Sequence, residues 1–160
     1  MIPQKQLDEL EKILGKCVRL CAWIEWQISI FHARDKTKNM WLGLYQNKNL
    51  NICVNKKAEN LFLKTWNNAE HDSFNKALKS LIDNDKSFEY FNKKQYNTLE
   101  QIRKLRNDVF HNSMCLYLDS RKHYDSEEID KYNNDLKKAK RLASLAEQYK
   151  GLINKRIESW

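Results

Sequence analysis

Glycine and proline are the residues that interrupt helices most strongly, and this chain of 160 residues contains three glycines and one proline. In a helix interior, glycine is less favourable than alanine by about 1 kcal/mol and proline by about 3 kcal/mol. Leucine, lysine, glutamate, glutamine and alanine, which favour helices, supply much of the remainder. The sequence therefore predicts long helices within one domain, residues 1–160, which is long enough to bury a core without disulfides or metal.

Apolar residues recur every three or four positions in several segments, which is the spacing of one face of a helix. The predicted helices cover about residues 4–33, 58–66, 73–82, 92–115 and 126–160. Asp72 or Ser73 is expected to cap the third helix and Ser126 the last one. Residues 35–57 are predicted to be loop with one short helix, and no segment has a convincing strand pattern. The prediction is an all-α, up-and-down bundle of four to five helices.

The first predicted helix becomes apolar on nearly every side from Trp23 onward, where Trp26, Ile30 and Phe31 follow. A helix that is apolar all round is usually buried on more than one face. In so small a protein, the second face predicts a subunit interface, and hence a homodimer.

The net charge of +8 predicts attraction to polyanions. Nucleic acid is the first candidate, and an acidic protein or an anionic membrane surface is the second. Enrichment in lysine and asparagine is equally well explained by a biased genome.

The four cysteines form no C-x-x-C pair and match no zinc spacing, so Cys17 and Cys21 are expected to be reduced core residues. No metal and no other cofactor is expected.

The start of the chain, "MIPQKQLDELEK", is too polar for a signal peptide. No apolar run approaches the ~20 residues that span a membrane. A cytoplasmic protein without a membrane partner is expected.

The segment "RKLRNDVFHNSM", residues 103–114, mixes core and reactive residue types. On a helix, Leu99, Ile102, Leu105 and Val109 cluster on one side, and Arg106 lies at the edge of that apolar arc. A buried guanidinium is costly unless it has a carboxylate partner, a wet cavity or an anionic ligand.

Glu25, isolated in the apolar part of the first helix, is the carboxylate expected to pair with Arg106. Asn107 and His111 are four residues apart and share a helix face. Arg106 and His111 are five apart and point about 140° apart on a regular helix. One straight helix does not readily aim both at one phosphate, so either the helix distorts or two copies meet across a dimer.

The residues "RNDVFH", 106–111, resemble the R-x4-6-H motif of the HEPN superfamily, including the polar residue that often follows the arginine. The resemblance implies a small α-helical bundle that dimerises so that two motifs form one composite site. It implies a metal-independent endoribonuclease of the kind found in toxin–antitoxin, abortive-infection and CRISPR systems. Arg106, Asn107 and His111 would then be catalytic, RNA the substrate, and an antitoxin or other regulatory protein a further partner.

The sequence departs from one branch of that family, in which a tyrosine stands two positions after the histidine and is adenylylated by the antitoxin. Here that position is Ser113, and the nearest tyrosine downstream is Tyr117. A nucleotidyltransferase antitoxin is therefore not implied.

The residue types suit RNA cleavage by attack of the 2′-hydroxyl. Histidine titrates near neutrality and fits either proton-transfer role, and arginine clamps phosphate oxygens while staying charged. Asn107 would orient His111 or bind the phosphate, and Arg103 and Lys104 are predicted to bind RNA. The expected products are a 2′,3′-cyclic phosphate and a 5′-hydroxyl.

Other interpretations stay open. HEPN domains include inactive members, so the chain is alternatively a non-catalytic helical dimer that binds a partner protein or a nucleotide. A third interpretation is a basic helical nucleic-acid binder without turnover. Arg106 is also explained by a structural ion pair and His111 by a surface position at a helix end. The remaining histidines, His32, His71 and His123, are expected to be exposed.

Overall fold

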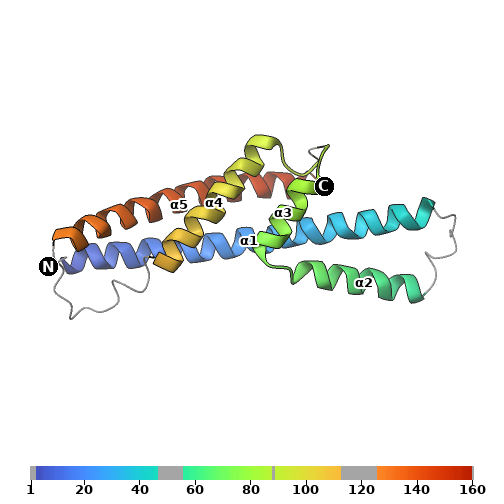
Figure 1. The fold of residues 1–160 in the computed structure, drawn as a ribbon, viewed down its shortest axis with the longest axis horizontal. Coiled ribbons are helices and arrows are strands. Elements are labelled where there is room, and N and C mark those ends of the chain that lie inside the picture. Colours follow the sequence, from blue (N-terminus) through green and yellow to red (C-terminus); the bar gives the residue numbers. More distant parts are fainter. Residues whose placement is uncertain (1–2, 47–55, 88, 113–125, 160) are drawn as a thin grey trace. The chain divides into compact units, whose positions relative to one another are not determined.

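The computed structural model describes residues 3–46, 56–87, 89–112 and 126–159, and within these ranges the chain forms five α-helices and no strand (Figure 1). The helices are α1 (Gln4–Gln46), α2 (Lys56–Glu70), α3 (Phe74–Asn84), α4 (Lys93–Asn112) and α5 (Ser126–Glu158). The predicted all-α class is confirmed.

The chain divides into two compact units. The first unit contains the residues up to Ile24 together with those from Lys94 onward, and the second unit is Glu25–Lys93. Helix α1 contributes residues to both. The expectation that all 160 residues form one domain stays a prediction.

In the first unit, α5 runs parallel to the first part of α1. The Tyr132 hydroxyl donates to the Gln6 carbonyl (2.5 Å) near the start of both helices. Further along, the Cys17 thiol donates to the Ala139 carbonyl (3.3 Å), and Lys16 pairs with Glu147 (2.5 Å). Residue numbers in the two helices rise together, so the helices have the same direction.

A seven-residue repeat of buried side chains holds this helix pair together. Leu10, Cys17 and Ile24 are buried in α1, and Tyr132, Ala139, Ala146 and Ile153 are buried in α5. Seven residues make nearly two helical turns, so each set returns to the same seam. Two alanines in the α5 set let the backbones approach closely, as the bond from the Cys17 thiol to the Ala139 carbonyl shows.

Burial makes Cys17 chemically inert. Cys17 and Cys21 are both free and buried, as predicted. Burial raises the pKa of the Cys17 thiol from its ordinary 9.0 to about 11. Because the thiolate is the nucleophile, we expect iodoacetamide to alkylate Cys17 at pH 8 at least ~100-fold more slowly in the native protein than in urea. Peptide mass mapping measures this ratio, and equal labelling in both states would show that the α1–α5 contact opens readily.

The second unit has an aromatic cluster where Tyr90 and Phe91 pack on α1. The Phe31 ring lies 5.7 Å from the Tyr90 ring in an edge-on arrangement and 5.0 Å from the Phe91 ring. Asp85, at the end of α3, holds the segment that carries both aromatics. Its carboxylate accepts backbone N–H groups from Glu89 (2.6 Å), Tyr90 (3.0 Å) and Phe91 (3.3 Å).

The prediction that residues 35–57 form a loop with one short helix is wrong over 35–46, because α1 continues to Gln46 instead of ending near Ala33. Tertiary contacts account for the extension of this polar stretch. Asp35 and Thr37 are buried, and Lys38 pairs with Glu89 (2.5 Å). The Thr37 hydroxyl donates within the helix, to the Ala33 carbonyl (2.9 Å), so its burial leaves no unsatisfied group. The loop prediction is also wrong at residues 56 and 57, where α2 has already begun.

The other helix boundaries differ less from the predictions. Helix α2 extends to Glu70, beyond the predicted end at Trp66, and the Trp66 indole donates to the Glu70 carboxylate (3.2 Å) across the added turn. Ser73 is the cap of α3, since its hydroxyl accepts the Lys76 N–H. Ser126 is itself the first residue of α5. Residues 113–115, predicted to end the fourth helix, lie outside the described residues.

Among the described helices, none combines the length and the apolar character needed to cross a membrane.

Candidate functional site

Helix α4 carries the R-x4-H motif in its last two turns. Tyr96, Leu99, Ile102 and Val109 are buried and anchor the helix in the first unit. The Tyr149 hydroxyl of α5 donates to the Gln95 carbonyl (2.7 Å), and Lys138 of α5 pairs with Asp108 (2.7 Å). These two contacts run in opposite senses along the helices, so α4 is antiparallel to α5. The buried arc is the one that helical spacing predicts.

Arg106 is half-buried, in agreement with its place at the edge of that arc. Its Nη1 donates to the Asn107 side-chain oxygen (3.1 Å), and its Nε is shielded from solvent. The bond to Asn107 restricts the rotamers of the guanidinium, and a restricted side chain loses less entropy when it binds an anion.

Asn107 and His111 are brought to one face of α4 by their four-residue spacing. His111 is exposed and Asn107 is partly buried. The helix is continuous from Lys93 to Asn112, without the distortion considered for the motif. On such a helix Arg106 and His111 diverge by about 140°. Arg106 and Asn107 are thus in contact within one chain, whereas His111 points away from Arg106.

The other residues predicted to belong to the site, Arg103, Lys104 and Glu25, have different surroundings. Arg103 donates to the Glu100 carboxylate through Nε (3.1 Å) and Nη2 (2.9 Å), so part of its donor capacity is used within α4. Lys104 is exposed. Glu25 is partly buried and belongs to the second unit, and its pairing with Arg106 stays a prediction.

His32 was expected to be exposed, and this is wrong: its side chain is 1% exposed and its Nε2 lies 3.0 Å from the Asp72 carboxylate. Its Nδ1 is buried and has no hydrogen-bond partner among the described residues. The available signal was its helical register, four residues after the apolar Ile28. His71 is exposed as predicted, and His123 lies outside the described residues.

The Asp72 carboxyl makes the free energy of unfolding of the second unit depend on pH. Burial raises the pKa of its carboxyl, but hydrogen bonds from Lys76 and His32 outweigh burial and leave the pKa below its ordinary 3.8. A carboxyl with a lowered folded pKa stabilises the protein above its unfolded pKa, and this stabilisation disappears as the pH falls through the folded value. We therefore expect wild type to exceed Asp72→Asn in free energy of unfolding above about pH 5. The difference should vanish in stronger acid, as urea titrations between pH 2 and 7 would measure. A difference that persists unchanged at pH 2 would contradict this assignment.

In the part of the chain that the structure describes, no three His, Cys, Asp or Glu side chains gather in a way that would hold a metal ion. Within the first unit, the side chains best suited to acid–base chemistry and phosphate binding are those at the end of α4. Together they offer the Arg106 cation, the Asn107 amide and the accessible His111 imidazole.

No protein-family model, no curated protein and no solved structure matches the chain.

Proposed function

We propose that this protein is a metal-independent endoribonuclease of HEPN type whose site is completed by a second copy of the chain. The observation that carries the proposal is the arrangement at the end of α4. Arg106 is half-buried and bonded to Asn107 (3.1 Å), and His111 is exposed one turn further on.

The groups match the charge changes of RNA cleavage. The 2′-oxygen forms a bond to phosphorus while the bond from phosphorus to the 5′-oxygen breaks. The His111 imidazole accepts the 2′-hydroxyl proton, and the imidazolium that results donates a proton to the leaving 5′-oxygen. The Arg106 guanidinium binds the phosphate oxygens and stabilises the negative charge that develops on them. The products are a 2′,3′-cyclic phosphate and a 5′-hydroxyl.

A second copy is needed because α4 is straight. Within one chain, Arg106 and His111 diverge by about 140°, so one phosphate does not reach both groups easily. Two α4 helices related by a twofold axis would place His111 of each copy beside Arg106 of the other. The exposed indole of Trp26, 54% accessible on α1, supports an interface, since large apolar side chains are commonly buried when subunits associate.

The direct test is cleavage of total tRNA and of a structured mRNA in EDTA, with analysis of the product ends. Wild type is expected to produce cyclic-phosphate and 5′-hydroxyl ends, and His111→Ala is expected to produce neither. Cleavage that requires added metal, or that is equal in both proteins, would refute the proposal.

The biological setting that the motif suggests is a toxin or antiviral effector, with an antitoxin or regulatory protein as partner. The alternative function, a non-catalytic dimer that binds a protein or a nucleotide, is favoured by no particular contact in the described residues. It predicts that Arg106→Ala and His111→Ala leave RNA intact to the same extent as wild type.

A further inference from the structure

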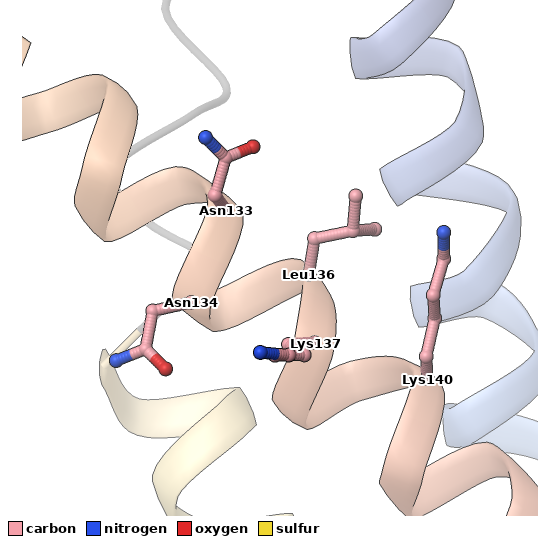
Figure 2. A pocket seen from close by; sticks show the side chains of 5 residues that line it. All are labelled: Asn133, Asn134, Leu136, Lys137 and Lys140. Atoms are coloured by element: carbon pink, nitrogen blue, oxygen red, sulfur yellow. The ribbon is translucent and has the colours of Figure 1, made fainter.

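A hollow on the surface of α5 belongs to the first unit and is separate from the R-x4-H motif. Its volume is about 360 Å³, within the range typical of small-ligand sites. The residues that line it are Asn133, Asn134, Leu136, Lys137 and Lys140 (Figure 2). Figure 2 shows Leu136 and Lys140 pointing toward α1, and Asn134 on the other side of α5.

The polar lining of the hollow favours an anion. Lys137 is exposed and has no ion-pair partner among the described residues. The Lys140 ammonium lies 2.7 Å from the Glu9 carboxylate, but both side chains are about half exposed, so this pair exchanges readily with solvent or another anion. None of the described lining residues is acidic. Two ammonium groups and two amides supply hydrogen-bond donors, and the amides also accept.

The hollow lies mainly on the side of α5 that is turned toward α1. Leu136 packs against the cluster of Leu10 and Tyr132, and Lys140 pairs with Glu9 of α1. Lys138, which pairs with Asp108 of α4 (2.7 Å), is two residues from both Leu136 and Lys140 and so points to the opposite side of α5. The hollow is therefore a surface distinct from the contact between α4 and α5.

We propose that this hollow binds the phosphodiester backbone of the RNA substrate. This inference rests on the proposed ribonuclease activity for its ligand. Lys137 and Lys140 contact phosphates, while Asn133 and Asn134 hydrogen-bond to a ribose hydroxyl or a base edge. The hollow thereby adds phosphate contacts that raise the affinity of the protein for the RNA strand.

The test is binding of a fluorescent single-stranded RNA whose 2′-hydroxyls are methylated, because this RNA cannot be cut by the proposed reaction. Lys137→Gln/Lys140→Gln is compared with Lys64→Gln/Lys79→Gln, which removes the same charge from two exposed positions in the second unit. The hollow variant is expected to bind about tenfold more weakly than the control in 0.1 M salt. Its plot of log affinity against log salt should be shallower by about 1.4, because each phosphate contact contributes about 0.7 for a single strand.

A second pair of variants checks the result without removing lysines. Asn133→Asp/Asn134→Asp places two carboxylates in the hollow, and Asn67→Asp/Asn68→Asp places them on the exposed part of α2. The first is expected to weaken binding at least tenfold relative to the second. Equal effects within each pair, or no RNA binding by wild type, would overturn the inference. Loss of binding confined to the hollow variants, with no cleavage by wild type, would support this site while refuting the ribonuclease.

Discussion

Arg106→Ala and His111→Ala should each abolish RNA cleavage when assayed alone, and a mixture of the two should regain activity. Removing one charge-stabilising donor typically lowers the rate by ~10² to 10³, and removing a general acid or base lowers it by ~10² to 10⁴. If each site uses Arg106 of one copy and His111 of the other, a mixed dimer keeps one intact pair. With random exchange of subunits in a twofold dimer, the mixture should recover about a quarter of wild-type activity.

The measurement is the initial rate of tRNA cleavage in EDTA after the two variants have been unfolded and refolded together. The control is the same two variants refolded separately and mixed immediately before the assay, so that few subunits have exchanged. Lys79→Ala, which removes an exposed charge from α3 in the second unit, should retain most activity. A mixture as inactive as its components would contradict the composite site, even if each variant is inactive alone.

Asp85→Ala is expected to destabilise the second unit by about 3 to 5 kcal/mol. The Asp85 carboxylate accepts three backbone N–H groups, from Glu89, Tyr90 and Phe91, and the last two residues are buried. Removing the carboxylate leaves these donors without their acceptor, and a buried unsatisfied donor typically costs about 1 to 3 kcal/mol. The aromatic cluster on Phe31 should loosen with the segment that carries Tyr90 and Phe91.

Urea unfolding followed by circular dichroism measures the effect, and Asp85→Asn is the matched control. Asparagine keeps one acceptor oxygen and replaces the other with an amide nitrogen that cannot accept. The stability of Asp85→Asn should therefore lie between those of wild type and Asp85→Ala. Asp83→Ala, an exposed position one turn from the same end of α3, should change stability by less than about 0.5 kcal/mol. If Asp85→Ala is as stable as Asp83→Ala, the carboxylate does not hold this segment.

The candidate site was predictable from the sequence where its features depend on one helix. The spacing of Leu99, Ile102 and Val109 defines the buried face of α4, and that face determines that Arg106 is half-buried. The four-residue spacing of Asn107 and His111 places them together on a helix. The side-chain bond between Arg106 and Asn107 is a matter of rotamers, which spacing alone does not specify.

The hollow on α5 was not predictable, although its lysines belong to the densest basic run of the sequence. A run of lysines reads equally well as a solvated helix face. Only the packing of α5 against α1 shows that Lys137 and Lys140 border a concave surface.

By itself, the sequence determined that the protein is helical and which face of each long helix is buried, because apolar spacing and the scarcity of glycine and proline act locally along the chain. Only the tertiary structure decided where polar segments become helical and which polar residues are buried. Residues 35–46 read as loop from their composition, yet they continue α1, where Lys38 pairs with Glu89, a residue far along the chain. His32 read as exposed, yet Asp72, forty residues later in the chain, compensates its burial. A buried polar group is tolerated only when another part of the chain supplies its partner, and that partner is identified by the fold rather than by neighbouring residues.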